Sequence, residues 1–279
     1  MAAVSLIAGI FVGSTGGNTI HQGTPSPTGY FQRIKTLGGT GPGSFFATER
    51  AAETGAITRT LRHTPYVRIA GNQHKEVALT FDDGPGPYTP QILSILEREN
   101  VPGTFFEVGV SETYFHASTS LIAARGYPIG DHTQEHAPMG KLPPAAQKTQ
   151  LLEDVSALGK YGAPFPRLFR PPYGSWDNAT LKLLHKYHML MVLWTVDTSD
   201  YRRPGTKAIV HAAVSGARPG AIMLLHDAGG NRTQTVQALP KIIKSLRARG
   251  YKLVTVPRLL LDNPPPKDQD ISAVIGAGG

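Results

Sequence analysis

The sequence contains no cysteine among its 279 residues. This absence excludes disulfides, thiol nucleophiles, cysteine-ligated zinc and iron–sulfur clusters. A metal bound to this chain must therefore be held by histidine and carboxylate side chains, and the sequence offers ten histidines.

Runs of five or more basic residues are also missing, as are internal repeats. The 28 Lys and Arg outnumber the 20 Asp and Glu and give a formal net charge of +8, but basic and aromatic residues do not interleave. We therefore expect no nucleic-acid partner. The excess charge is interpreted as solvated surface that suits polyanionic surroundings, such as an anionic cell wall.

The chain begins with an apolar run, residues 1–12, that is too short to span a bilayer and lacks the positive start of a secretory signal. We interpret it as a truncated signal or possible membrane anchor, the alternative being a frayed apolar terminus. This predicts an extracytoplasmic protein, secreted or membrane-anchored and facing the cell wall. Residues 13–74, rich in Gly, Ser, Thr and Pro, are predicted to be a linker.

From residue 75 to 258, short apolar runs alternate with segments whose apolar residues recur at helical spacing. The runs predicted as strands are 77–81, 104–108, 128–129, 168–170, 189–196, 222–226 and 252–256. Alternation of strands and helices predicts an α/β fold with parallel strands and helical crossovers. Seven strands favour a barrel with one unit fewer than the eight-fold form. Residues 259–279 are expected to be a loose C-terminal tail.

Polar residues follow five of these strands. They are Asp82-Asp83-Gly84-Pro85, Asp131 to His136, Arg170 to Gly174, Asp197 to Asp200, and His226-Asp227. An isolated Asp-Asp-Gly-Pro is more often a simple turn than a site. However, catalytic side chains of parallel barrels come from the C-terminal ends of strands, so five such clusters point to one site.

His132 and His136 lie four residues apart and are close enough to share one ion. Two imidazoles and one carboxylate leave coordination positions open for water and substrate, as in catalytic zinc sites. Two histidines at this spacing without a further ligand are a surface feature about as often as they are a metal site. Here a carboxylate is available at the same end of the predicted barrel.

Two other metal templates fit part of this pattern. His132 to His136 matches the His-x-x-Glu-His motif of inverted zinc peptidases, but nearby Gly and Pro residues leave no room for the long helix that motif needs. We therefore expect Glu135 to be solvated. Two histidines and a carboxylate also suit ferrous oxygenases, which usually have antiparallel β scaffolds.

The five clusters together resemble the ordered motifs of the polysaccharide deacetylases, the family-four carbohydrate esterases with a nodulation-deacetylase type domain. The matching residues are Thr80 to Pro85, His132-Thr133-x-x-His136, Arg170 to Gly174, Asp197-Thr198-x-Asp200 and Leu224-x-His226-Asp227. The resemblance covers about residues 75–257. It implies a distorted (β/α)7 TIM-like barrel that hydrolyses N-acetyl or O-acetyl groups on sugars with the help of a metal.

The resemblance also implies roles for individual residues. The implied metal ligands are Asp83, His132 and His136. The implied catalytic residues are Asp82 as general base, Arg170 as its partner, His226 as general acid, Asp200 as the carboxylate orienting His226, and Tyr173 as a backbone oxyanion donor. Leu224 matches a residue of the acetyl pocket, and Tyr201 and Pro172 are expected to bind substrate.

Two residues depart from the family pattern. Asp131 stands where the family commonly has Asn, and an extra carboxylate there could change metal affinity. Tyr201 stands where Trp is frequent, which adds a hydroxyl to the groove wall. Trp176 is expected either to stack on sugar or to join the core.

The residues fit the chemistry of amide hydrolysis, which needs a nucleophilic water, a base, an oxyanion donor and an acid. We expect Arg170 to keep Asp82 ionised, and Asp200 to raise the pKa of His226 so that the imidazole stays protonated. Zn²⁺ is the expected cofactor, with Co²⁺, Mn²⁺ and Ni²⁺ as alternatives.

The predicted function is a metal-dependent hydrolase that releases acetate from an N-acetylglucosamine polymer, either peptidoglycan or chitin-like oligomers. We expect a monomer whose partner is the acetylated polysaccharide. One alternative is an O-deacetylase acting on acetylxylan. The other is a non-catalytic wall-binding module, which would be expected to have lost at least one of the motif residues.

Overall fold

The computed structural model describes residues 42–270, with side chains from residue 49 onward. The chain divides into two units, residues 1–47 and 48–279, and the second contains all the strands of the described residues. The predicted signal or anchor at residues 1–12, the linker up to residue 41 and the tail beyond residue 270 lie outside the described residues. Among residues 42–270, no helix combines the length and apolarity needed to cross a membrane.

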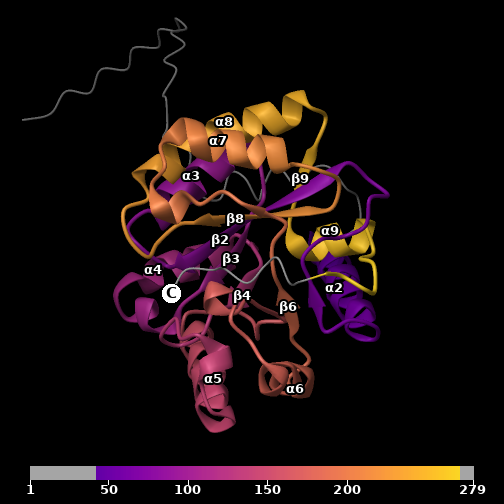
Figure 1. Cartoon of the computed structure of the whole chain (residues 1–279), viewed down its shortest axis with the longest axis vertical. Coiled ribbons are helices and arrows are strands. Elements are labelled where there is room, and N and C mark those ends of the chain that lie inside the picture. Colours follow the sequence, from indigo (N-terminus) through magenta and orange to yellow (C-terminus); the bar gives the residue numbers. More distant parts are fainter. Residues whose placement is uncertain (1–41, 271–279) are drawn as a thin grey trace, which may run out of the picture. The chain divides into compact units, whose positions relative to one another are not determined.

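A parallel sheet forms the centre of the fold (Figure 1). Its strands are β1 (Tyr66–Val67), β2 (Glu76–Gly84), β3 (Thr104–Glu107), β4 (Ile129–Asp131), β5 (Leu168–Phe169), β6 (Leu190–Val192), β7 (Val196–Asp197), β8 (Ala221–His226) and β9 (Lys252–Val254). They follow the order β1-β6-β5-β4-β3-β2-β8-β7, and β9 pairs with the start of β2. The sheet curls into a partly closed, TIM-like barrel, which confirms the predicted α/β class.

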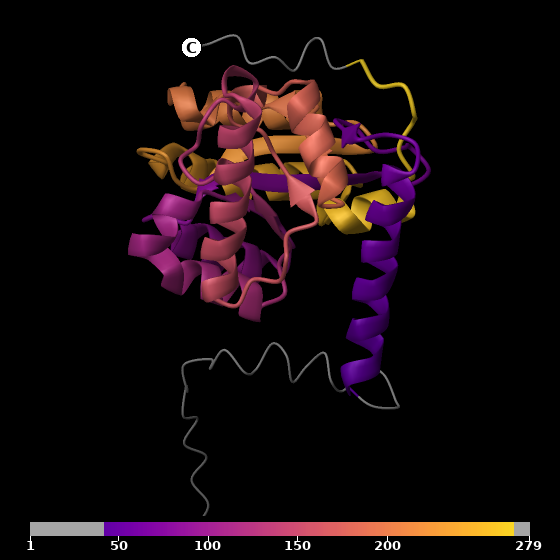
Figure 2. The same ribbon diagram turned by 90° about the horizontal axis from the view of Figure 1, so that it is seen from below.

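The helices cover the outside of this sheet (Figures 1 and 2). They are α2 (Pro42–Leu61), α3 (Thr89–Glu99), α4 (Gly109–Ala124), α5 (Pro144–Lys160), α6 (Asn178–Lys186), α7 (Thr206–Gly216), α8 (Thr233–Ala248) and α9 (Val256–Asp262), with 3-10 turns η1 (Met139–Lys141), η2 (Pro172–Gly174) and η3 (Asp200–Arg202). Ile92, Leu93 and Leu96 place the apolar face of α3 in the core, where Phe81 stacks on Phe105 with ring centroids 5.3 Å apart. Each such buried side chain contributes about 1.5–3 kcal/mol.

The predicted strand at 189–196 is two strands. β6 pairs with β5 and β1, whereas β7 pairs with β8. Between them the backbone changes partners, because Leu193 N–H donates to Val67 O at 2.7 Å and Thr195 N–H donates to Ile222 O at 2.9 Å. This short stretch therefore joins the two edges of the curled sheet, which local hydrophobicity does not reveal.

Part of the predicted linker at 13–74 is wrong, because residues 42–61 form α2 and residues 66–67 form β1. Ala56 and Ile57 of α2 are buried in a cluster with Val67 and Leu260. Arg258 of α9 also donates to Glu49 Oε1 at 2.9 Å. The helix has few apolar residues and is fixed by distant contacts, so its composition resembles that of a linker.

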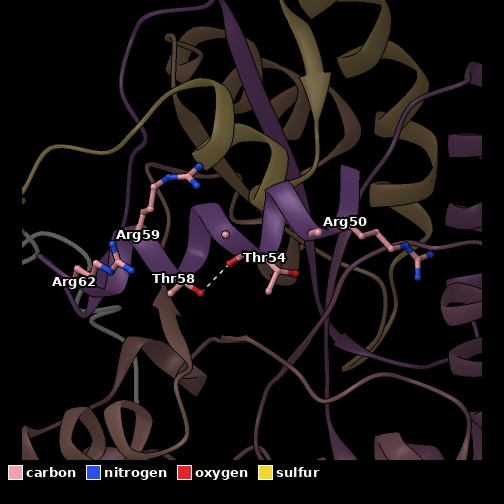
Figure 3. A pocket seen from close by; sticks show the side chains of 7 residues that line it. Arg50, Thr54, Thr58, Arg59 and Arg62 are labelled. Carbon is pink, nitrogen blue, oxygen red and sulfur yellow. Dashed lines mark hydrogen bonds between the residues drawn. The ribbon is translucent and has the colours of Figure 1, made fainter. Parts of the chain in front are cut away.

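The outer face of α2 carries a shallow pocket lined by Arg50, Thr54, Thr58, Arg59 and Arg62 (Figure 3). Thr58 Oγ1 donates to Thr54 O at 3.0 Å along the same helix. The residues lining this pocket come from α2 and from Arg62, which directly follows it, and include no carboxylate or imidazole. The pocket therefore offers no acid–base or metal-binding chemistry.

The prediction of a loose tail at 259–279 is also wrong for residues 259–270. Residues up to 262 complete α9, and Asn263 is buried, where it donates to Glu76 Oε2 at 2.9 Å. Gln269 Oε1 accepts the backbone N–H groups of Arg68 at 2.8 Å and Ile69 at 3.0 Å. These contacts span about 190 to 200 residues of sequence and satisfy donors that would otherwise lack partners.

Candidate active site

The polar clusters that follow the predicted strands open onto one cavity of about 560 Å³. Its walls come from the carboxyl ends of β2, β7 and β8 and from the loops that follow β3, β4 and β5. The short connections place these residues at the same end of the barrel, as expected for a parallel barrel.

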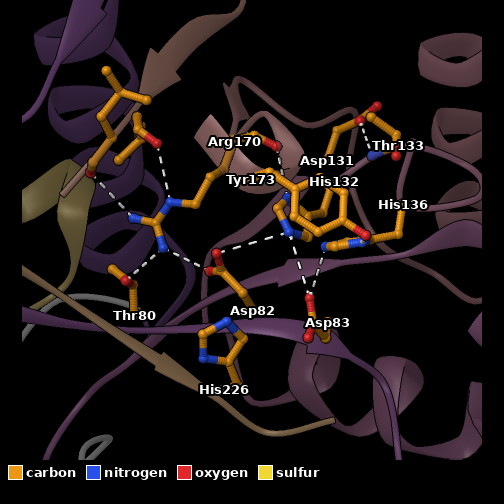
Figure 4. Close-up of polar contacts among 12 residues, drawn as sticks. Thr80, Asp82, Asp83, Asp131, His132, Thr133, His136, Arg170, Tyr173 and His226 are labelled. Carbon is orange, nitrogen blue, oxygen red and sulfur yellow. Dashed lines mark hydrogen bonds and ion pairs between the residues drawn. The ribbon is translucent and has the colours of Figure 1, made fainter. Parts of the chain in front are cut away.

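Asp83, His132 and His136 form a cluster whose ligand atoms all lie within 4.8 Å of one another (Figure 4). Asp83 Oδ1 is 3.1 Å from His136 Nε2 and 3.6 Å from His132 Nε2. Burial opposes ionisation of Asp83, but its contacts with the two imidazoles hold its pKa well below the usual range. Asp83 Oδ1 is buried with no hydrogen-bond donor among the described residues. A carboxylate and two imidazoles facing one point fit a divalent metal.

Hydrogen bonds fix the orientation of both imidazoles. His132 Nδ1 lies 2.6 Å from the carbonyl oxygen of Arg170, which can only accept, so this nitrogen carries a proton and Nε2, which faces Asp83, is the nitrogen left to bind a metal. His136 Nδ1 lies 3.1 Å from Tyr173 Oη. Both rings thus present Nε2 to the same point.

The loop between the two histidines is held by α5. Asp154 Oδ2 accepts the His132 N–H at 3.1 Å, and Gln150 Oε1 accepts the Glu135 N–H at 2.9 Å. Gln150 Nε2 in turn donates to Glu135 Oε2 at 2.9 Å, so Glu135 is exposed as expected but is also tied to α5. His136 has a positive φ of 55°, a conformation that needs such support. Neither Gln150 nor Asp154 was predicted from the sequence.

Asp131 is fully buried and accepts the Thr133 N–H at 2.9 Å. Burial raises the pKa of Asp131 to about 7, and Asp154 lies within hydrogen-bond reach. Asp131 is not part of the cluster of candidate metal ligands. It therefore acts on the histidine loop and is not an additional ligand.

Replacing Gln150 with alanine should loosen this loop and weaken divalent-metal affinity by about 10- to 100-fold, the usual cost of losing support behind a metal ligand. Isothermal titration calorimetry with Zn²⁺ measures the change. Thr149→Ala, an exposed substitution one residue away on α5, is the matched control. Unchanged affinity in Gln150→Ala would show that the loop holds its shape without α5.

Asp82 is paired with Arg170, which is fully buried beneath the cavity (Figure 4). Arg170 Nη1 donates to Asp82 Oδ1 at 2.6 Å and to Thr80 Oγ1 at 2.7 Å. Its remaining donors reach the carbonyl oxygens of Val192 at 3.0 Å and Leu193 at 3.3 Å. With Oδ1 held by the guanidinium, Asp82 Oδ2 is left available at the cavity.

His226 is held by Asp200, which is itself buried. Asp200 Oδ1 lies 2.7 Å from His226 Nδ1, and its Oδ2 accepts the His226 N–H at 2.8 Å and the Thr235 hydroxyl at 2.7 Å. Burial lowers the pKa of His226, but the Asp200 carboxylate outweighs this effect and raises the pKa to about 9. The imidazole is therefore protonated at neutral pH.

Leu224, Tyr201 and Tyr173 line the cavity, whereas Pro172, which was also expected to bind substrate, does not. Pro172 is buried in η2, and its neighbour Pro171 forms the wall instead, because the chain turns sharply at Tyr173, where φ is 59°. Trp176 was expected either to stack on sugar or to join the core. It is half-buried against an apolar cluster and does not line the cavity.

Other cavity residues were not predicted. Trp194, Arg202 and Arg232 line the cavity, and Arg232 Nη2 lies 3.7 Å from Asp83 Oδ2. Trp194 belongs to the stretch that joins the two edges of the sheet, so its position depends on the closure of the barrel. Arg232 follows the last predicted cluster by five residues, and no pattern in the sequence sets it apart.

Comparisons with known proteins agree on one family. The sequence profile of the polysaccharide deacetylases matches residues 70–192. A peptidoglycan-N-acetylglucosamine deacetylase of Bacillus cereus (strain ATCC 14579) is 36% identical over 208 residues, which cover 73% of this chain and 97% of that protein. A chitooligosaccharide deacetylase of Bradyrhizobium sp. (strain ANU 289) is 36% identical over 202 residues, 66% of this chain and 90% of that protein.

Solved structures show the same likeness. A crystal structure of a peptidoglycan N-acetylglucosamine deacetylase bound to 4-naphthalen-1-yl-N-oxidanyl-benzamide has a TM-score of 0.69 and 31% identity, and covers 77% of this chain and 100% of its own. A pseudoenzyme of the CE4 family from Bacillus anthracis has a TM-score of 0.66 and 29% identity, covering 71% of this chain and 69% of its own.

Proposed function

The chain belongs to the polysaccharide deacetylase family, the CE4 hydrolases, and from that premise we propose that it removes the N-acetyl group of N-acetylglucosamine in peptidoglycan with Zn²⁺ as cofactor. The observation that carries this proposal is that three metal-ligand candidates line one cavity together with Asp82 and His226, which are paired from behind with Arg170 and Asp200. They supply the groups that amide hydrolysis requires.

Asp83, His132 and His136 would hold the metal. A divalent ion bound at this position would lower the pKa of water towards about 7 and polarise the acetyl carbonyl. The chain itself contributes the orientation of the ligands, because the Arg170 carbonyl and the Tyr173 hydroxyl fix the two imidazole rings.

Asp82 is the proposed general base. Arg170 stabilises its negative charge from the side away from the cavity, so Oδ2 can accept a proton from the water that attacks the acetyl carbon. The water oxygen forms a bond to this carbon, and the carbonyl oxygen becomes negatively charged. The Tyr173 backbone N–H in η2 is the proposed donor to that oxyanion.

His226 is the proposed general acid. The C–N bond breaks when its electron pair leaves with the sugar nitrogen, and protonated His226 donates a proton to that nitrogen to give the free amine and acetate. Asp200 keeps the imidazole charged and fixes its ring. Leu224 and Tyr201 are the proposed contacts for the acetyl group and the sugar.

The relatives favour peptidoglycan and chitin-like oligomers as substrates over acetylxylan. The similar pseudoenzyme raises the alternative of a non-catalytic wall-binding protein. Against that alternative, Asp82, Asp83, His132, His136 and His226 are all present and converge on one cavity. We further propose an extracytoplasmic location, which the apolar run at residues 1–12 and the net charge of +8 support.

A substrate panel tests the proposal. Peptidoglycan, chitin oligomers and acetylxylan are incubated side by side with the Zn²⁺-loaded protein, and mass spectrometry of the products records the loss of acetyl groups. Peptidoglycan should lose them, and chelation or His132→Ala should abolish that loss, because each removes the metal. Glycan binding without acetate release in metal-replete protein would contradict the proposal.

Activity should fall as the pH rises through about 9, where His226 loses its proton. Its pKa is raised in the folded protein, so the active acid is present below this value and absent above it. Asp200→Asn removes the carboxylate that raises the pKa, which should shift the alkaline limb of kcat/KM towards the ordinary value of about 6.5. A pH–rate profile with acetate release as readout measures the shift, and an unmoved limb would remove Asp200 from this role.

A further inference from the structure

Arg202 is a charged residue of the cavity wall that the proposed reaction does not use. It is exposed, and its guanidinium has no hydrogen bond or ion pair with any residue that the structure describes. Its guanidinium instead lies over the ring of Tyr201, whose centroid is 5.4 Å from Cζ. Arg202 therefore presents a positive charge to whatever enters the cavity.

The other charged residues of the wall outside the reaction centre are already engaged. Glu135 is held by α5, and Asp197 Oδ2 accepts the Tyr201 hydroxyl at 3.3 Å. Arg232 is buried and donates to two backbone carbonyls of the loop after β8, at 2.5 and 2.8 Å. Among the charged wall residues outside the reaction centre, Arg202 is thus the one whose side chain has no hydrogen-bond or ion-pair partner among the described residues.

The backbone holds Arg202 at a fixed place beside the reaction centre. It ends η3, which lies between Ser199 and Arg203, both with positive φ, of 52° and 57°. Its N–H donates to Ser199 O at 3.0 Å. Tyr201 lies edge-on to the imidazole of His226, with ring centroids 5.3 Å apart. Arg202 and the proposed general acid therefore both contact the Tyr201 ring.

We propose that Arg202 binds a carboxylate carried by the sugar next to the one being deacetylated, and so gives the enzyme a preference for acidic glycan. This inference rests on the proposed function. A planar guanidinium matches a carboxylate through two parallel hydrogen bonds. In peptidoglycan strands from which the stem peptide has been removed, the neighbouring muramic acid carries a free lactyl carboxylate. In peptide-bearing strands this group is an amide, and chitin oligomers carry no acid. Arg202 would thus distinguish peptide-free peptidoglycan strands from both peptide-bearing strands and chitin oligomers.

The test compares three tetrasaccharides: one of alternating N-acetylglucosamine and N-acetylmuramic acid with free lactyl carboxylates, the same compound with those groups amidated, and the neutral chitin tetramer. The Zn²⁺-loaded full chain should show a KM for the free acid about fivefold lower than for its amide, the upper range for an exposed ion pair. Arg202→Gln should remove that difference while leaving kcat and the chitin tetramer unaffected. Raising the salt to about 1 M should also reduce the wild-type preference.

Arg203→Gln is the matched control, since Arg203 is the adjacent exposed arginine and does not line the cavity. Arg202→Lys keeps the positive charge but lacks the two parallel N–H donors of the guanidinium. It should retain part of the preference that Arg202→Gln loses. An acid preference that survives in Arg202→Gln would overturn the inference, as would an equal loss of kcat on all three compounds, which would mean that Arg202 acts through Tyr201. Absence of acetate release from every compound by the wild-type protein would refute the proposed function itself.

Discussion

Asp82→Asn should lower kcat for acetate release by about 10²- to 10⁴-fold, the range expected for loss of a general base. Asparagine has the same shape and can still accept a hydrogen bond from Arg170, but it cannot take a proton from water. Zn²⁺ affinity should stay close to that of the wild type, because Asp82 is not among the clustered ligand candidates. The kcat and the Zn²⁺ affinity together distinguish loss of the general base from loss of the bound metal.

Glu99→Gln, a neutralised carboxylate at the end of α3, is the control for Asp82→Asn and should leave kcat unchanged. If Asp82→Asn kept kcat within about threefold of the wild type, another group would have to accept the proton. The structure offers Asp83 as the neighbouring carboxylate, but it faces the two imidazoles. Retained activity would therefore require a different mechanism.

Arg170→Met should reduce the free energy of unfolding by about 3–5 kcal/mol, because it leaves the buried Asp82 carboxylate without its cation. Arg170 is fully buried, and Asp82 is only 3% exposed. The change also removes donors to Thr80 and to the carbonyl groups of Val192 and Leu193. Urea denaturation followed by circular dichroism measures the loss.

A double variant distinguishes the ion pair from simple packing. Asp82→Leu combined with Arg170→Met removes both charges, and replacement of a whole buried pair by apolar residues is often neutral. The double variant should therefore be more stable than Arg170→Met alone, although inactive. Additive losses would show that Arg170 stabilises the barrel through its backbone contacts and not through Asp82. Arg247→Met, at an exposed arginine of α8, should cost at most about 1 kcal/mol.

Much of the fold was predictable because buried parallel strands leave a strong local pattern. The runs that became β2, β3 and β8 are short, apolar and followed by polar residues. Helix α2 was missed because two buried apolar residues and a distant ion pair fix it, and these form no periodic pattern. Strand β1 was missed because it has only two residues, which pair with β6. The segment up to residue 270 was missed for a similar reason, since Gln269 bonds to backbone groups about 200 residues away.

In the candidate site, too, local sequence patterns predicted some residues, and distant contacts decided the others. His132, His136 and a strand-end carboxylate were predictable as metal ligands, because histidine and carboxylate are the strong ligands left to a chain without cysteine. The choice of Asp83 over Asp82 came from the family resemblance. Gln150 and Asp154 were not, since they are inward-facing polar residues on a helix and support the histidine loop from behind. Pro172 was misplaced because the turn at Tyr173 presents its neighbour to the cavity instead.

The amino-acid sequence by itself determined the types of group available, their order along the chain and their positions at the ends of strands. The tertiary structure decided which atom of each group faces the cavity. His132 presents Nε2 because its Nδ1 meets the carbonyl of Arg170, and Asp82 is left with Oδ2 because Oδ1 meets the guanidinium of the same residue. These contacts join residues 38 and 88 positions apart, and such distances are set only when the sheet closes.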